Sequence, residues 1–270
     1  MSDIISVEHL AYTYPGVEDT PGVPVFADLN LTIEEGSFVA VLGTNGCGKS
    51  TLLKLLYDER LVSGYAEWSG ELLRGQTRMG YLPQEPSPQA LGEAVRTFWS
   101  QGSALTPPEE AALLRSLSLP ADLPSWDRPL GRLSGGERVK LQLARLLGEQ
   151  PDLLLLDEPS NDLDIDTLDW LETFIRECAQ PVLFISHDEL LLERTANVIL
   201  HMEQLRRKTL PRWTVARMGY RQYVEERLQK FTHQEQLARK EREEERKQQE
   251  RFQKIQCIDC RLSFQCQRTP

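Results

Sequence analysis

Residues 43–51, GTNGCGKST, fit the spacing G-x-x-x-x-G-K-[ST]. Phosphate binding explains this spacing, because glycines let successive backbone N–H groups curl around phosphate oxygens, while Lys49 adds a positive charge and the Ser50 hydroxyl can ligate Mg2+. An apolar run precedes the segment and a leucine-rich helical pattern follows it, which an ordinary glycine-rich turn would not require. The sequence therefore predicts a nucleoside triphosphate site formed by Gly43, Asn45, Gly46, Gly48, Lys49, Ser50 and Thr51.

Two adjacent acids, Asp157 and Glu158, follow four consecutive leucines at residues 153–156. Such a run indicates a buried parallel strand that brings carboxylates to the sheet edge where nucleotides bind. Asp157 is predicted to hold Mg2+, directly or through water. Glu158 points the other way and can act as general base on an attacking water. Two acids that cap a helix are the simpler alternative, but it leaves the four leucines unexplained.

A third motif is LSGGE at residues 133–137, which is followed by an apolar pattern typical of a helix. A serine and two glycines at a helix N-terminus offer exposed N–H groups and a hydroxyl to an anion. On its own, this is also a common way for a helix to begin. In company with the other two motifs, it predicts a second phosphate cradle at Ser134, Gly135, Gly136 and Glu137.

Together the three motifs resemble the ATP-binding cassette family, whose signature is LSGGE or LSGGQ. Further family elements occur in order: Tyr14 at the place of the adenine-stacking aromatic, Gln84 as the glutamine-loop residue and His187 as the switch histidine. Alone, His187 would be interpreted as a helix-capping or core residue. Tyr14 competes with Tyr12, and tyrosines in strands are usually structural.

The resemblance implies an enzyme that hydrolyses ATP. The resemblance implies that Ser50, Gln84 and Asp157 bind Mg2+, and that Glu158 and His187 position the hydrolytic water. In this family the signature of one cassette completes the ATP site of another. The sequence holds one phosphate loop and one signature. A second cassette is therefore expected, either another copy of the chain, a different chain or a missing half of its own polypeptide.

Composition limits the class of protein. The 270 residues have room for one large domain and an appendage. The sequence has no apolar run of membrane-spanning length and no signal peptide, which predicts a cytoplasmic protein without direct membrane insertion. The five cysteines are too few and too unevenly placed for a disulfide framework, in agreement with a reducing compartment.

Charge is distributed unevenly along a chain whose formal net charge is −10. Residues 1–200 hold 14 Lys and Arg against 31 Asp and Glu, whereas residues 201–270 hold 17 against 10. An acidic body with a basic arm favours contact with nucleic acid through the arm. A solvated charged helix is the alternative, because residues 220–255 alone carry 10 positive and 8 negative side chains.

Residues 220–255 contain no proline or glycine and are rich in Glu, Lys, Arg and Gln, which predicts a long charged helix. With LDEPSNDLD at residues 156–164 and MGYRQY at 218–223, this helix makes the chain resemble the ABC-F proteins, which carry two cassettes joined by a charged helical linker. Asp162 replaces the family's more frequent histidine. The resemblance implies action on the ribosome and its RNA, in translation or in antibiotic resistance by ribosome protection. The alternatives are the ATPase subunit of a membrane transporter and an ATP-gated binding module.

The predicted fold is the α/β P-loop NTPase fold of an ABC-type cassette, with a mostly parallel core sheet, an antiparallel β subdomain, a helical subdomain and a long charged C-terminal helix. The antiparallel strands are expected near residues 4–9, 29–34 and 65–68, and the core strands near 38–42, 79–82, 153–157, 182–186 and 198–201. The predicted domains are a cassette at 1–203 with its helical subdomain at 85–132, an extended basic connector at 204–219, the charged helix at 220–255 and a disordered tail at 256–270.

The predicted tail departs from both the helical composition and the family pattern, which suggests a truncated chain. Cys257, Cys260 and Cys266 could instead hold zinc. Structural zinc needs four well-placed ligands, and no histidine lies near these cysteines, so the zinc interpretation is disfavoured.

Overall fold

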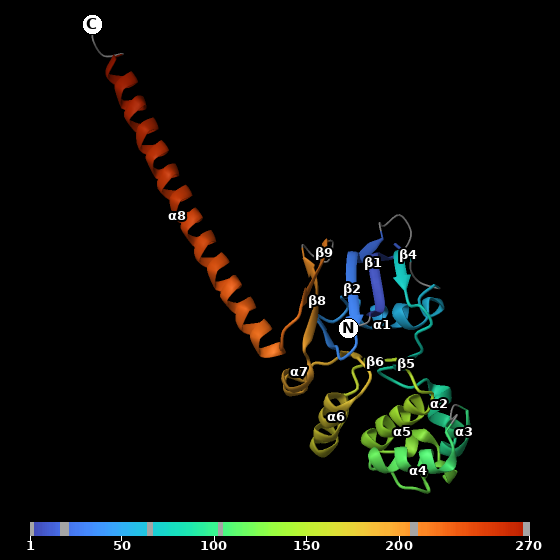
Figure 1. Ribbon diagram of the computed structural model, residues 1–270. Helices are drawn as coiled ribbons and strands as arrows, with labels where there is room; N and C mark the ends of the chain where they lie inside the picture. The colour runs from blue at the N-terminus through green and yellow to red at the C-terminus, as the bar shows by residue number, and fades with distance from the viewer. Residues whose placement is uncertain (1–2, 17–21, 64–66, 102–104, 206–209, 267–270) are drawn as a thin grey trace. The chain divides into compact units, whose positions relative to one another are not determined.

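The computed structural model describes residues 3–16, 22–63, 67–101, 105–205 and 210–266, and for residues 205, 210 and 247–266 it describes the backbone alone. The chain divides into two compact units, Met1–Tyr220 and Arg221–Pro270. The first unit contains two sheets and a group of helices, and a long helix makes up the second (Figure 1).

A six-stranded sheet forms the centre of the first unit, in the order β5-β6-β7-β3-β8-β9. The first five strands are parallel, whereas β9 runs antiparallel to β8. β6 and β7 are buried over their whole length, as short apolar strands of a parallel sheet are when both faces are covered. The strands are β3 (Phe38–Gly43), β5 (Met79–Leu82), β6 (Leu153–Asp157), β7 (Val182–Ile185), β8 (Val198–Leu205) and β9 (Leu210–Ala216).

A second, antiparallel sheet has the order β2-β1-β4. Its strands are β1 (Asp3–Tyr14), β2 (Val23–Glu34) and β4 (Glu67–Leu73). β1 and β2 are longer than the predicted strands at 4–9 and 29–34. Each contains a residue with positive φ near a break in register, His9 in β1 and Asp28 in β2. Such bulges interrupt the alternation of buried and exposed residues, so the sequence pattern shortens both strands.

Helix α1 (Lys49–Tyr57) joins the two sheets into one body. Leu52, Leu53, Leu55 and Leu56 are fully buried, and one apolar cluster contains residues of α1 and of both sheets. Burying a leucine side chain contributes about 1.5–3 kcal/mol, so this contact holds α1 firmly. The N-terminus of the helix is thereby fixed at the loop that follows β3.

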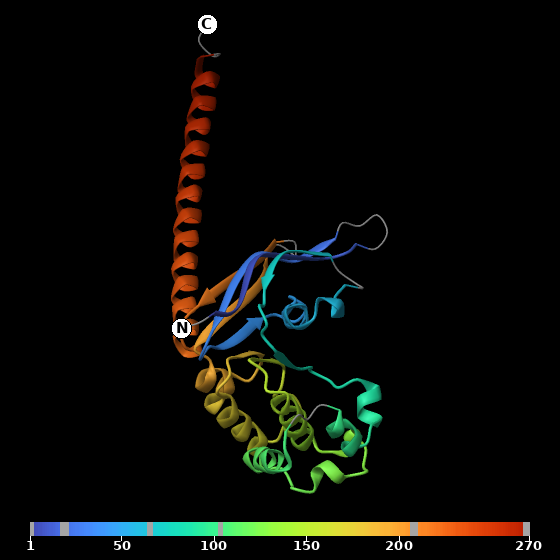
Figure 2. The ribbon, with the colours of Figure 1, turned by 45° about the vertical axis from the view of Figure 1, so that its right-hand side comes forward.

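The chain between β5 and β6 forms a helical group with an apolar core of its own (Figure 2). Val95, Leu114, Leu123 and Leu141 are buried in this core. α5 begins directly after Ser134, so the packing of this group determines how the signature is presented. The helices of the first unit after α1 are α2 (Pro88–Gly92), α3 (Val95–Ser100), α4 (Pro107–Ser116), α5 (Gly135–Gly148), α6 (Ile165–Glu177) and α7 (Glu189–Thr195), with short 3-10 helices at Glu59–Leu61, Leu123–Ser125 and Leu130–Arg132.

The segment after β8 differs from the extended connector predicted at residues 204–219. Residues 210–216 form β9, which pairs with β8 from Leu205↔Leu210 to Ile199↔Ala216. The indole N–H of Trp213 donates a hydrogen bond to the carbonyl oxygen of Ala27 over 3.1 Å, and its ring packs against the central apolar cluster. The segment is therefore the edge strand of the central sheet rather than a free connector.

The second unit is α8 (Tyr220–Cys266). The helix continues past residue 255 to Cys266, through most of the stretch predicted as a disordered tail at 256–270. Residues 256–266 contain neither proline nor glycine, so nothing in the backbone ends the helix where the composition changes. The side chains of Cys257, Cys260 and Cys266 lie outside the described part, and the zinc hypothesis with them. Among the described residues, no helix has both the length and the apolarity to cross a membrane.

Candidate nucleotide site

The loop between β3 and α1 has a backbone that only glycine accommodates at several positions. Gly43, Gly46 and Gly48 all have positive φ. A Cβ atom on Gly48 would lie 2.0 Å from Cγ1 of Val25, and one on Gly43 would lie 2.4 Å from the carbonyl oxygen of Met202. The glycine spacing is therefore required by the path of the loop as well as by room for phosphates.

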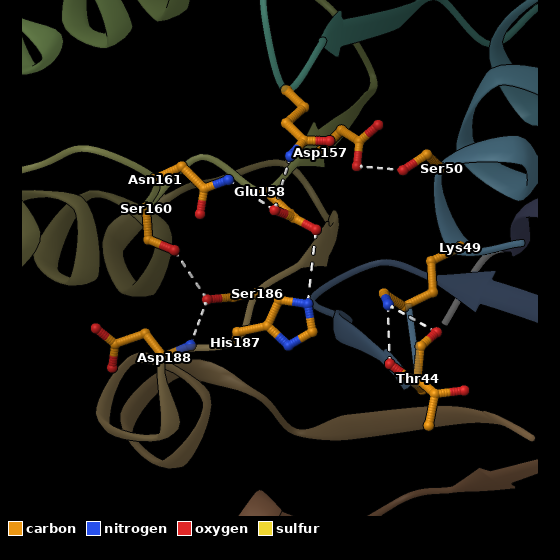
Figure 3. Close-up of polar contacts among 12 residues, drawn as sticks. Thr44, Lys49, Ser50, Asp157, Glu158, Ser160, Asn161, Ser186, His187 and Asp188 are labelled. Carbon is orange, nitrogen blue, oxygen red and sulfur yellow. Dashed lines mark hydrogen bonds and ion pairs between the residues drawn. The ribbon is translucent and has the colours of Figure 1, made fainter. Parts of the chain in front are cut away.

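Lys49 crosses this loop (Figure 3). The side chain is 6% exposed, and its Nζ donates hydrogen bonds to the carbonyl oxygens of Gly43 over 2.8 Å and Thr44 over 3.3 Å. The N-cap residue of α1 is Gly48, which offers no side-chain cap, and the first turn of the helix has no acidic residue. The free N–H groups, the helix dipole and the ammonium group together form a concentrated positive site suited to phosphate.

The Asp157 carboxylate lies at the C-terminal end of β6 and is 2% exposed. The hydroxyl of Ser50 donates to its Oδ1 over 2.9 Å, and the hydroxyl of Tyr81 donates to its Oδ2 over 3.2 Å. Burial raises the pKa of Asp157, while these two hydrogen bonds act against the rise. A buried carboxylate and a serine hydroxyl make a hard oxygen donor set, and this set fits Mg2+.

Replacing Asp157 with asparagine is expected to stabilise the metal-free protein at neutral pH. Because the pKa of Asp157 is raised in the folded state, the folded protein favours the protonated carboxyl. The stabilising contribution of Asp157 is complete below its unfolded-state pKa and is lost as pH rises through its folded-state pKa. The substitution Asp157→Asn removes the buried charge, and a gain on the order of 1 kcal/mol corresponds to a Tm increase of about 2–4 °C. The measurement is thermal unfolding with and without Mg2+.

Mg2+ should raise the Tm of the parent and leave the Tm of Asp157→Asn unchanged. Asp152→Asn is the matched control, because Asp152 is 45% exposed in its side chain and lies 3.8 Å from the Arg78 guanidinium. It should give no increase in Tm. An Asp157→Asn variant that unfolds at a lower temperature than the parent would contradict the argument from burial.

Glu158 lies among three polar side chains (Figure 3). Its Oε2 accepts hydrogen bonds from Nε2 of Gln84 over 3.0 Å and from Nδ2 of Asn161 over 2.6 Å. Its Oε1 lies 3.6 Å from Nε2 of His187, which is an ion-pair distance rather than a hydrogen bond. Glu158 also has a φ of 51°, a strained conformation for a non-glycine residue.

The structure thus brings the phosphate loop to Asp157, although Ser50 and Asp157 are 107 residues apart in the sequence. It also places Glu158 beside His187. Gln84 contacts Glu158 here, and its place beside a metal stays a prediction. Tyr81 and Asn161 also contact these acids but were not expected to. Two observations indicate these contacts: β5, which contains Tyr81, pairs with β6, and Asn161 follows Glu158 by only three residues.

Tyr14 lies beside the phosphate loop. Its hydroxyl shares a hydrogen bond of 2.7 Å with the hydroxyl of Thr51. Tyr12 is fully buried between Tyr14 and Phe26, with ring centroids 5.4 Å and 5.3 Å away. Tyr12 is therefore the structural tyrosine of the pair, and stacking of adenine on Tyr14 stays a prediction.

The signature begins α5. Ser134 and Glu137 form a reciprocal capping box, in which each side chain accepts the other's backbone N–H. A Cβ atom on Gly135 would lie 2.6 Å from the carbonyl oxygen of Asp162, and one on Gly136 would lie 2.5 Å from Oγ1 of Thr167. The glycines allow α5 to pack closely against the chain that follows Glu158.

Comparison with known proteins agrees with this geometry. The family model described as ABC transporter matches residues 26–161, which include the phosphate loop, the signature, Asp157 and Glu158. The solved structure of a metal-chelate type ABC transporter in an inward-facing conformation matches with a TM-score of 0.60 and 26% identity, covering 80% of this chain and 84% of that one.

Curated relatives include two kinds of protein with translation-related names. The energy-dependent translational throttle protein EttA of Haemophilus influenzae is 36% identical over 221 residues, covering 67% of this chain and 38% of the relative. The ribosome protection protein VmlR of Bacillus subtilis is 34% identical over 180 residues, covering 64% and 30%. The chain therefore spans less than half the length of the curated relatives it matches.

Proposed function

This chain belongs to the ABC transporter family of ATP-binding cassettes, with ABC-F proteins among its relatives, and on that premise we propose that it binds ATP with Mg2+ and hydrolyses it to ADP and phosphate. The observation that carries this proposal is the arrangement around β6. Asp157 contacts the phosphate-loop serine, while Glu158 lies beside His187. A metal-holding acid and a general base thus occur on adjacent residues.

The proposed roles follow from position. Lys49 and the loop N–H groups bind the phosphates of ATP. Ser50 and Asp157, with Gln84, would hold Mg2+, which neutralises phosphate charge when bound. Glu158 accepts a proton from the attacking water as its oxygen bonds to the γ-phosphorus, and the bond to ADP breaks.

His187 would orient the water or the γ-phosphate from the same side. Its ring is 53% exposed and borders Glu158, so it is open to a ligand. Tyr14 would stack on adenine. Ser134, Gly135, Gly136 and Glu137 would complete the ATP site of a second cassette, because their contacts are with Arg128, Asp162 and Thr167 rather than with the phosphate loop. The second cassette would be another copy of the chain, a different chain or another half of a longer polypeptide.

The rate of ATP hydrolysis per chain is expected to rise with protein concentration. Each complete site needs a signature from another molecule, so the active fraction follows the association of two chains. Steady-state phosphate release over a hundredfold dilution series measures this dependence. Titration of a fluorescent ATP analogue is the control, because binding to the chain's own phosphate loop should not change with dilution. A high rate independent of concentration would contradict the need for a second cassette.

We further propose that the chain acts on the ribosome or its RNA in the cytoplasm, in translation or in ribosome protection. The names of EttA and VmlR support this proposal, as does the excess of Lys and Arg in residues 201–270. The ATPase subunit of a membrane transporter is the second candidate, and the structural similarity to a transporter cassette favours it.

Association with ribosomes is expected to depend on α8 and to weaken steeply with salt, because contacts between Lys or Arg and phosphate release counterions. The deletion that tests this removes residues 221–270 and keeps β9, which belongs to the sheet. Co-sedimentation with ribosomes between about 50 and 200 mM salt should show about a tenfold loss or more for the parent, and little binding for the deletion variant. Binding that survives the deletion unchanged would move the contact from α8 to the acidic cassette and would contradict this prediction.

A further inference from the structure

Glu137 in the signature carries a charge that conflicts with phosphate binding. Its Oε2 accepts hydrogen bonds from the backbone N–H of Ser134 over 2.9 Å and from the Ser134 hydroxyl over 3.1 Å. This capping role holds the start of α5 in place. The same carboxylate places a full negative charge beside the groups that, on the proposed function, receive the phosphates of an opposing ATP. A glutamine would cap the helix equally well without that charge.

Arg128 supplies the opposite charge. Its Nη2 lies 3.2 Å from Oε1 of Glu137, the oxygen that the capping box leaves unused. The guanidinium carbon lies 3.9 Å from the centroid of the Trp126 ring, and the backbone carbonyl of Arg128 accepts a hydrogen bond from Val95 over 3.0 Å. Stacking on the indole and anchoring of the backbone hold the guanidinium in one place more firmly than an ordinary surface side chain.

We infer that Arg128 is a positioning residue for the signature, which neutralises Glu137 so that this acidic signature can accept the γ-phosphate of ATP bound by a second cassette. The inference rests on the proposed function. In the structure the Ser134 hydroxyl donates its proton to Glu137. Because Arg128 pairs with the Glu137 carboxylate, that carboxylate competes less strongly for the Ser134 hydroxyl. The hydroxyl can then donate to a phosphate oxygen instead.

The ionisation of Glu137 makes a counter-charge necessary. Its hydrogen bond from the Ser134 backbone, with a smaller contribution from Arg128, holds the pKa of Glu137 below its usual range. The carboxylate is therefore charged throughout the physiological pH range. Protonation does not relieve the repulsion toward phosphate, so the relief must come from a cation.

The experiment measures association of the full chain by sedimentation, with Mg2+ and a non-hydrolysable ATP analogue. Arg128→Gln should weaken nucleotide-driven association about fivefold or more, because an unpaired carboxylate then faces phosphate, and the effect should shrink as salt screens it. Glu137→Gln should associate at least as tightly as the parent. The double variant should return to within about twofold of the parent.

Affinity of the single chain for the fluorescent ATP analogue should be the same in all four proteins, and a loss in Arg128→Gln would overturn the inference by showing general damage. A merely structural role, through stacking on Trp126, predicts that the double variant stays as weak as Arg128→Gln. That result, or an Arg128→Gln variant that associates as tightly as the parent, would overturn the inference and leave the proposed function standing. A parent that does not associate with the analogue would overturn the inference for pairs of this chain, while ATP binding to the single chain would show that the proposed function stands.

Discussion

Glu158→Gln is expected to lower the rate of ATP hydrolysis by about 10²–10⁴-fold while leaving ATP affinity nearly unchanged. The rate falls because an amide cannot accept the proton of the attacking water, and general base catalysis typically contributes this much. Affinity remains because the glutamine oxygen can still accept the hydrogen bonds from Gln84 and Asn161, so the local structure is preserved. Phosphate release and equilibrium nucleotide titration measure the two quantities on the same protein.

Glu177→Gln is the matched control, because it makes the same chemical change at the exposed end of α6. It should hydrolyse ATP like the parent. In any dimer, Glu158→Gln should also prolong the ATP-bound state, which sedimentation with ATP would detect. Turnover of Glu158→Gln at the parental rate would show that another group activates the water, and the assignment of Glu158 would be wrong.

Lys49→Met is expected to weaken ATP binding by about 100-fold. The ammonium group is nearly buried and lies across the phosphate loop, where it donates to the carbonyl oxygens of Gly43 and Thr44. When phosphate replaces these carbonyl oxygens, the bonds become charge-assisted, and each contributes about 1.5–3 kcal/mol. Methionine keeps most of the apolar stem but removes the charge, so the measurement isolates the electrostatic contribution.

Lys140→Met on α5 serves as the control for loss of a lysine charge, since the ammonium of Lys140 lies 4.6 Å from the Trp170 ring centroid rather than in the loop. Isothermal titration with ATP and Mg2+ should show parental affinity for this control. Thermal unfolding should show both variants folded. Lys49→Met with affinity within about threefold of the parent would remove Lys49 from the phosphate site.

The sequence determined the glycine-rich loop and the core strands because their signals are local. Residues 79–82 and 153–157 form strands with the predicted bounds, since each is a short apolar run that a buried parallel strand requires. The ABC-type fold and the family are confirmed. The phosphate loop is likewise specified by adjacent residues, because φ at Gly48 and the start of α1 depend on a few neighbours.

The length of α8 could also be predicted from local sequence, but the predicted helix ended at residue 255 rather than at Cys266. A change of composition at residue 257 suggested a tail, although helix formation depends on backbone preference and on the absence of proline and glycine. The prediction ended the helix where the sequence leaves the family pattern, whereas the backbone preferences of residues 256–266 allow the helix to continue.

The tertiary structure alone decided three other features. β9 exists because residues 210–216 pair with β8 and because Trp213 reaches Ala27, a residue 186 positions earlier. The amide of Gln84 reaches Glu158, and Arg128 reaches Glu137 within the helical group. Each contact depends on where separate elements lie in space, and a one-dimensional pattern of hydrophobicity or charge does not contain that information. The sequence thus determined which chemical groups are present, and the packing of the two sheets and the helical group decided which of them meet.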